Sequence, residues 1–269
     1  MNSDTPPVAT ATAVPSSRLA SRLLNVLVAP GDVFAEVKAM ALCHANWLVP
    51  AALFLLASWC AAAILFSQEA IRQQMVDVQD RAMQQQFQKQ IDAGKMTQAQ
   101  ADQIKASTAR FAGIGQMIGG FVAPVFAAGV KVFWGGFIVW VGACFIFKRP
   151  VEYLKAVEVS GLSLVILAIG ALVKGLLGAA LGNLFASPGP VLLLKSFDPT
   201  NPLHTSLVGL DVFTLWALVV VSIGLAKLCE VSVVKGMAWV IGVWVVITGA
   251  WLGFALGMQK AVATLTGAH

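Results

Sequence analysis

Apolar residues gather into five long stretches with few charges between them, and this pattern predicts helices that cross a lipid bilayer. The clearest stretch, 47–66, contains no charged side chain. A hydrocarbon core about 30 Å thick needs roughly 20 helical residues, because each residue advances a helix by about 1.5 Å. The other stretches occupy 111–147 and about 157–185, 206–226 and 236–258. We therefore expect an all-α integral membrane protein with a bundle of five transmembrane helices.

The second stretch, 111–147, is too long for one span perpendicular to the membrane. We expect a helix that begins outside the membrane, bends at Pro124 and crosses the bilayer over roughly its last 22 to 25 residues. Lys148, Arg149 and Pro150 then end it.

The polar, glutamine-rich residues 67–110 predict a helical hairpin outside the membrane, between the first and second spans. Gly94 can end one helix, and Thr97 with Gln100 has the capping-box spacing that begins another. The bend is therefore expected at 93–96. Packing of the two arms on each other is favoured, and contact with a partner is the alternative.

The region before the first span divides into two parts. Residues 1–16 are rich in proline and small side chains and predict a disordered cytoplasmic tail. Residues 17–46 predict an N-terminal amphipathic segment, in which Arg18 and Arg22 occupy one part of a helix surface and leucines another. This helix either lies on the membrane with its arginines at headgroup level or docks on the bundle. Residues 33–38 are expected to touch the interface.

The composition agrees with a membrane protein, because 58% of the residues are hydrophobic and only 12% are charged. Roughly 25% are charged in ordinary soluble domains. The net charge of +5 needs no nucleic-acid partner, because basic residues concentrate in short loops beside anionic lipid headgroups. The bilayer is the expected partner.

Basic residues in the short loops predict the orientation of the chain. One side of the membrane receives Arg18, Arg22, Lys38, Lys148, Arg149, Lys155, Lys227 and Lys235. The other side receives only Lys195 and Lys260 outside the hairpin. We expect a plasma (inner) membrane protein with a cytoplasmic N terminus, a membrane domain over 47–258 and a short outer tail over 259–269.

Small residues recur at the spacing that lets two helices approach closely. The pairs and the triple are Gly115 with Gly119, Gly178 with Gly182, and Gly249 with Gly253 and Gly257. Glycine every fourth residue removes side chains from one helix face, so a neighbouring backbone can come close. Contact within the bundle is favoured, and a seam between two copies is the alternative.

Three charged residues lie well away from the ends of the predicted spans: Lys131, Lys174 and Asp211. Charge within a membrane is costly and usually faces protein or water. Counted along each helix from its cytoplasmic end, all three lie at a depth of about 24 to 25 Å. We expect Asp211 to pair with Lys131, Lys174 or both in a polar layer. The alternative is that each side chain reaches the outer interface separately.

The sequence contains no signature of catalysis. The three histidines are scattered, and neither an HExxH motif nor a close His/Cys/Asp cluster occurs, so no metal or cofactor is expected. Residues 161–165 read Gly-Leu-Ser-Leu-Val and lack the last glycine of a nucleophile elbow, so Ser163 is interpreted as a packing residue. We treat Cys43, Cys60, Cys144 and Cys229 as reduced packing residues.

Three blocks of sequence carry a family resemblance. They are "APGDVFAEV" at 29–37, "FKRPVEYLKAVEVSGLS" at 147–163 and "LDVFTLWALVVVSIGLAKL" at 210–228. With their order and loop lengths, the chain resembles the Yip family, the Ypt/Rab-interacting membrane proteins, and in particular its bacterial branch, over about 24–258. The resemblance implies five membrane helices and a cytoplasmic N terminus.

In eukaryotic members the resemblance also implies binding to prenylated small GTPases and a role in vesicle traffic. This chain departs from the family pattern at the positions that would support that role. The acidic-Leu-Tyr-Gly-Pro signature before the first span is missing, and Gly161-Leu162 stands where many members have Gly-Tyr followed by a proline.

The leading functional hypothesis is therefore a non-enzymatic membrane protein that organises membranes or binds partners, either another protein or a second copy. The alternative is a small transporter or lipid-handling protein that uses the layer of Lys131, Lys174 and Asp211, with a substrate that the sequence does not name. Five spans without an internal duplication weaken the transporter hypothesis. An intramembrane enzyme is the weakest hypothesis, because the sequence offers no nucleophile or metal site.

Overall fold

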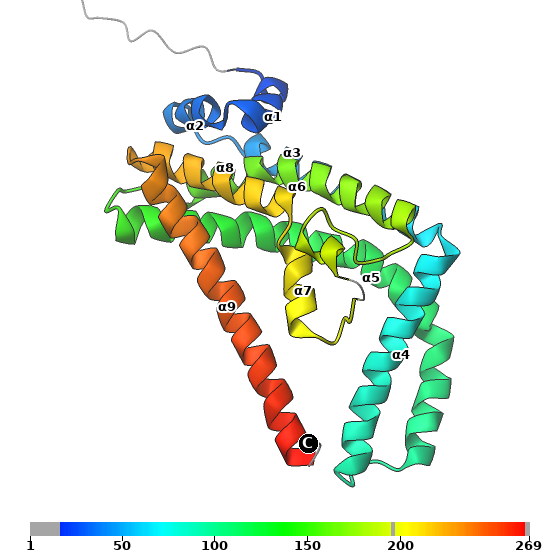
Figure 1. Ribbon diagram of the computed structural model, residues 1–269. Helices are drawn as coiled ribbons and strands as arrows, with labels where there is room; N and C mark the ends of the chain where they lie inside the picture. Colours follow the sequence, from blue (N-terminus) through cyan, green and yellow to red (C-terminus); the bar gives the residue numbers. More distant parts are fainter. Residues whose placement is uncertain (1–16, 195–196, 267–269) are drawn as a thin grey trace, which may run out of the picture.

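A computed structural model describes residues 17–194 and 197–266, without the side chains of 109–118 and 262–266. All regular elements of this part are helices (Figure 1). They are α1 (Leu19–Val28), α2 (Pro30–Ala39), α3 (Ala45–Phe66), α4 (Glu69–Asp92), α5 (Gln98–Val141), α6 (Tyr153–Leu181), α7 (Pro202–Gly209), α8 (Val212–Cys229) and α9 (Val233–Thr266). A π-helical turn, Gly142–Ile146, follows α5, and a 3-10 turn, Pro190–Leu193, precedes α7.

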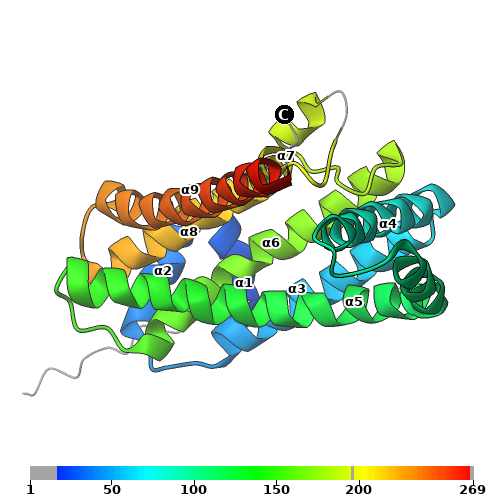
Figure 2. The same ribbon diagram turned by 90° about the horizontal axis from the view of Figure 1, so that it is seen from below.

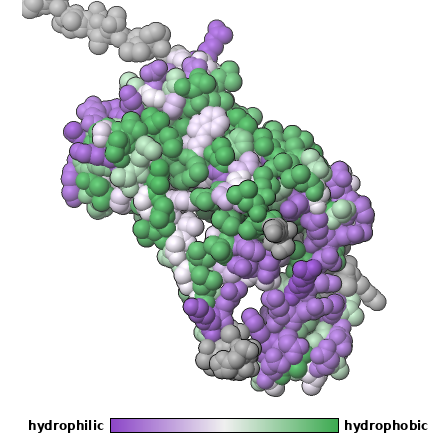
Figure 3. Space-filling view, in the orientation of Figure 1, coloured by the Kyte–Doolittle hydropathy of each residue, from purple (hydrophilic) through white to green (hydrophobic). Residues whose placement is uncertain are grey.

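Five helical segments are long and apolar enough to cross a membrane, which confirms the predicted architecture. They are Ala45–Phe66, Gly119–Ile146, Tyr153–Leu181, Val212–Cys229 and Val233–Ala261. Hydrophobic surface covers the bundle, and hydrophilic surface covers α4 and the adjoining arm of α5 (Figure 3). The chain is thus a multi-pass membrane protein with one large polar projection.

The polar projection is the predicted hairpin. Helix α4 ends at Asp92, and Gly94 takes a left-handed conformation with φ +66°. At the start of α5 the hydroxyl of Thr97 accepts a hydrogen bond from the backbone N–H of Gln100, whose side chain accepts one from the N–H of Thr97. This capping box satisfies two amide groups that a helix start leaves without partners.

Helix α5 carries both the second arm of the hairpin and most of the second span. It remains α-helical for 44 residues, with Pro124 inside it. Figure 1 shows the axis of α5 turning between the hairpin arm and the bundle. A proline removes one backbone hydrogen bond and bends a helix at that point. After the π-helical turn, Lys148 adopts φ +54° and the chain reverses toward α6.

Helix α6 forms the centre of the bundle and contacts α3, α5 and α8. Every residue from 156 to 164 is buried. A Cβ atom added to Gly161 would lie 2.5 Å from Cα of Trp47, and one added to Gly175 would lie 2.8 Å from Cα of Ala61. Only glycine allows this approach of α3, which explains why these two helices pack along most of their lengths.

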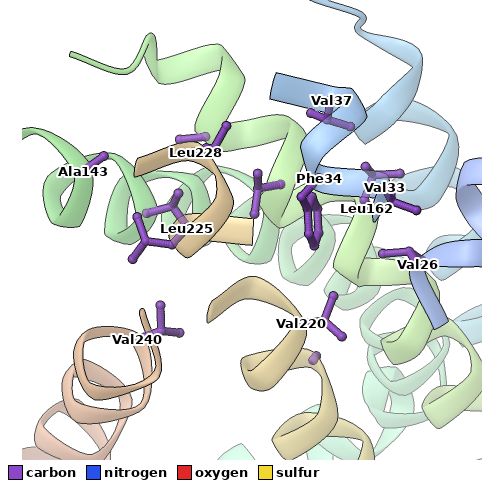
Figure 4. Close-up of a cluster of buried hydrophobic side chains, with 14 of the residues drawn as sticks. Val26, Val33, Phe34, Val37, Ala143, Leu162, Val220, Leu225, Leu228 and Val240 are labelled. Carbon is purple, nitrogen blue, oxygen red and sulfur yellow. The ribbon is translucent and has the colours of Figure 1, made fainter. Parts of the chain in front are cut away.

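The N-terminal helices dock on the bundle, which answers one question that the sequence left open. Phe34 and Val37 of α2 are fully buried against residues of α6 and α8, including Val220 (Figure 4). On α1, Val26 is buried while Val28 is 82% exposed. The apolar face of α2 is therefore covered by protein, and the expectation that 33–38 touches the interface stays a prediction for its polar face.

The predicted fourth span, 206–226, begins too early. Residues up to Gly209 belong to α7, and Asp211 has an extended conformation before α8 begins at Val212. The carboxylate of Asp211 accepts hydrogen bonds from the N–H groups of Phe213 and Thr214. Aspartate is a preferred N-cap residue for this reason, so it marks the start of the span.

Helix α9 is longer than predicted and is the least buried span. It continues to Thr266, so residues 259–266 are helical where a tail was expected. Only 6% of the most apolar 18-residue stretch of α9 is buried, compared with 44% of the corresponding stretch of α8. Figures 1 and 2 show α9 starting beside α8 and then leaving the bundle. The predicted disordered tail, 1–16, lies outside the described residues, as do 267–269.

Candidate functional site

One ion pair joins the third span to the start of the fourth. The ammonium nitrogen of Lys174 lies 2.7 Å from a carboxylate oxygen of Asp211. The Asp211 side chain is fully buried, while 35% of the Lys174 side chain is exposed. The hydroxyl of Thr214 donates a further hydrogen bond to the same oxygen, at 2.6 Å. The carboxylate therefore has a cation and three other donors around it.

Lys131 does not join this pair. Among the described residues, no hydrogen bond or ion pair is formed by its side chain, which is exposed. Its backbone carbonyl accepts a hydrogen bond from Ser160, and Ser160 precedes Lys174 by 14 positions in α6, or about 21 Å of helix.

The prediction that all three charges share one depth stays a prediction. It measured the depth of Lys174 from Glu158, taken as a residue near the membrane edge. In the structure Glu158 is fully buried, and α6 begins five residues earlier, at Tyr153.

A cavity of about 320 Å³ lies between α5, α6, α8 and α9. Lys131, Ser160, Ser163 and Thr214 provide the polar side chains of its wall. The remaining wall is apolar or aromatic apart from Gly135. Its volume falls within the range of about 300–1,000 Å³ that is typical of small-molecule sites.

The hydroxyl groups in the cavity wall are already engaged. Ser163 donates to the backbone carbonyl of Ser160 at 2.7 Å, and Ser160 donates to that of Lys131 at 2.9 Å. Thr214 donates to Asp211. These bonds agree with the interpretation of Ser163 as a packing residue, because its hydroxyl bonds within its own helix.

A second polar cluster, which the sequence analysis missed, lies where α1, α3 and α6 meet. The carboxylate of Glu158 accepts hydrogen bonds from the side chain of Asn46 at 3.0 Å and the N–H of Cys43 at 2.6 Å. Lys155 forms an ion pair with it at 3.2 Å. Asn46 in turn accepts a bond from Arg22. The available sequence signal was an acidic residue within the apolar run after Val157.

Arg22 connects this cluster to α2. It is 4% exposed and donates to Glu36 at 3.2 Å and to the carbonyl of Ser17 at 2.6 Å. Burial by itself would raise the pKa of Glu36, but hydrogen bonds from Ser17 and Arg22 outweigh it and lower that pKa. Of the two arrangements expected for this helix, the structure shows docking on the bundle, and the charge of Arg22 is neutralised within the protein.

The glycine motifs have different surroundings. A Cβ atom on Gly178 would lie 2.8 Å from the side chain of Leu65, so this residue packs against α3. Gly182 instead ends α6 in a left-handed conformation, with φ +58°. Gly115 lies among residues whose side-chain surroundings are not described.

The other motif glycines face open space. An added Cβ atom would meet nothing within 4 Å at the positions in question, which are Gly119, Gly249, Gly253 and Gly257. Contact of these glycines within the bundle, the favoured expectation, is therefore not what the structure shows. For the triple this follows from the divergence of α9 from the other spans.

Metal binding and disulfide formation find no support in the described part of the chain. No three His, Cys, Asp or Glu residues there are grouped so that they could hold a metal ion. All four cysteines there are free, and Cys229 is buried.

Comparison with known proteins identifies a family for the chain. The family model described as the Yip1 domain matches residues 24–254. Neither the curated proteins nor the solved structures gave a significant match. The family match covers the first four membrane-crossing segments completely and the fifth as far as residue 254.

Proposed function

The chain belongs to the Yip1 domain family, and from this premise we propose that it is a non-enzymatic protein of the plasma (inner) membrane that organises partners within the bilayer. The N terminus is cytoplasmic and the C terminus extracytoplasmic in this proposal, because the basic residues concentrate in the loops on one side. The hydroxyl of Ser163 bonds within its own helix, which fits a packing role better than that of a nucleophile.

The observation that carries this proposal is the open face of α9. Gly249, Gly253 and Gly257 repeat every fourth residue on a span that is almost unburied. Exposure to lipid alone does not indicate a partner, because an apolar helix is stable in lipid. A stripe without side chains, however, lets a second helix approach its backbone closely.

The partner that fits best is a second copy of the chain. The same stripe on two copies forms a self-complementary contact about a two-fold axis, which is the commonest symmetry of homo-oligomers. Interhelical van der Waals contact then replaces contact with lipid along the later half of α9. A dimer of this kind would place two bundles side by side in the membrane.

Self-association in lipid nanodiscs or native membranes tests the proposal. Cross-linking should give a dimer for the unmodified chain, and Gly253→Leu should abolish it because the side chain separates the two backbones. Ala255→Leu is the matched control, since it adds a leucine to the opposite face of α9 and should leave the dimer intact. A monomeric unmodified chain, or a dimer insensitive to Gly253→Leu, would contradict the proposal.

A second candidate function, favoured by the cavity, is that of a small transporter or lipid-handling protein that uses Lys131, Lys174 and Asp211. The mainly apolar wall favours lipid over a water-soluble substrate. This candidate predicts that replacing Lys131 changes lipid binding and leaves self-association unchanged.

A further inference from the structure

We propose that the cavity between α5, α6, α8 and α9 binds one anionic phospholipid, with the phosphate on the ammonium of Lys131 and part of an acyl chain inside the cavity. This inference rests on the second candidate function, for which it supplies a ligand class. It does not depend on self-association through α9.

The first step of the argument is that Lys131 carries the free charge of the cavity. The three hydroxyl groups in the wall donate to other atoms of the protein. The Lys131 ammonium has three N–H donors, and no hydrogen bond joins it to the part of the chain that the structure describes. A ligand with an acceptor group would therefore bind at this side chain.

The second step is that the missing countercharge comes from outside the chain. A cation within a membrane is costly unless it is paired. The carboxylate of Asp211, which bonds to Thr214 of the cavity wall, is already held by Lys174 and by three further donors. An anionic group beside Lys131 would provide the pairing that the protein does not supply.

The third step identifies the source of the anion. Val130, Trp134 and Ile247 line the cavity and are each more than 40% exposed, so the cavity opens between α5 and α9. Figure 1 shows these two helices diverging. In a membrane this opening faces lipid. A phospholipid can bind there with its acyl chain against the apolar wall, whereas a free anion has no chain to fill the cavity.

The two parts of the lipid contribute differently. Moving an acyl chain from among other lipid tails into an apolar cavity changes its free energy little, because both surroundings are equally apolar. The phosphate gains a charge-assisted hydrogen bond, for which lysine is a common partner. The headgroup charge should therefore determine which lipid is selected, and the cavity should determine that the ligand has a chain.

Native mass spectrometry of the full chain in detergent tests the inference, with phosphatidylglycerol, phosphatidylcholine and inorganic phosphate as separate probes. We expect one phosphatidylglycerol to bind more tightly than phosphatidylcholine. Lys131→Gln should weaken phosphatidylglycerol binding about tenfold or more, the effect of losing one charge-assisted hydrogen bond. Lys131→Arg should retain the binding, and Lys235→Gln, which removes an exposed lysine elsewhere, should leave it unchanged.

A cavity-filling variant tests the position of the chain. Ile247→Trp enlarges a partly exposed residue at the opening, so folding should tolerate it while the affinity for phosphatidylglycerol falls. Binding that survives both Lys131→Gln and Ile247→Trp would overturn the inference, as would displacement of the lipid by an equal concentration of inorganic phosphate. Gly253→Leu should bind lipid normally, so failure of the dimer and failure of the lipid site are distinguishable.

Discussion

Replacing Asp211 by asparagine separates the ion pair with Lys174 from the hydrogen bonds by which the same side chain caps α8. The carboxylate accepts bonds from the N–H groups of Phe213 and Thr214 at 3.0 and 3.2 Å, and from the ammonium at 2.7 Å. The amide oxygen of asparagine can keep the two backbone bonds that cap α8. Its NH₂ group, however, offers Lys174 a second donor in place of a negative charge.

The expected loss of stability follows from how far each of the two side chains in the ion pair is buried. Removing one partner of a buried ion pair costs about 3–5 kcal/mol, and the 35% exposure of Lys174 screens part of this. We therefore expect Asp211→Asn to lower the free energy of unfolding by about 2–3 kcal/mol. Since 1 kcal/mol moves the Tm of a domain of 150–250 residues by about 2–4 °C, the Tm should fall by roughly 4–12 °C.

Thermal unfolding in detergent micelles, followed by circular dichroism, measures this change. A double-mutant cycle with Lys174→Met should show a coupling energy of about 1 kcal/mol or more, because the second replacement removes the cation that the first leaves unpaired. Asp198→Asn is the matched control, since Asp198 is exposed in a loop. A Tm for Asp211→Asn equal to that of the control, or purely additive effects in the cycle, would refute the reasoning.

Three further predictions concern the packing of the helices. The contribution of ionised Glu36 to stability is complete above its ordinary pKa of 4.5 and disappears as the pH falls through its lowered pKa. Acid should therefore increase the rate at which protease cleaves α1. Glu36→Gln should remove this dependence of cleavage on pH. Gly175→Ala should destabilise the fold by about 1–3 kcal/mol through the clash with Ala61, whereas Gly249→Ala should change the Tm little. Thr97→Ala removes the capping hydroxyl and should lower the free energy of opening the first turn of α5 by about 1 kcal/mol, which hydrogen exchange of that turn measures.

Those features of the fold that depend on local chemistry were predictable from the sequence. Hydrophobic length gave five spans, and the capping box at Thr97 placed the second arm of the hairpin. The early start predicted for the fourth span shows the limit of this approach. Hydropathy did not separate α7 from α8, although Asp211 carried the capping information that marks the boundary.

The polar contacts depend on tertiary structure, which a single sequence does not contain. The pairing of Lys174 with Asp211 was one of the expected arrangements, but the sequence could not choose between two lysines. The partners of Arg22 lie on three other segments, so its burial could not be derived from the amphipathic pattern of α1. The open surroundings of Gly253 likewise depend on the divergence of α9 from the bundle.

The most direct test of the account is the side of the membrane on which each part of the chain lies. Green fluorescent protein, which fluoresces in the cytoplasm, and alkaline phosphatase, which is active outside it, can each be fused at the N terminus, in the hairpin turn near Gly94 and at the C terminus. Five spans predict a cytoplasmic N terminus with the hairpin and the C terminus both outside. Reporters that place the two termini on the same side would contradict the account.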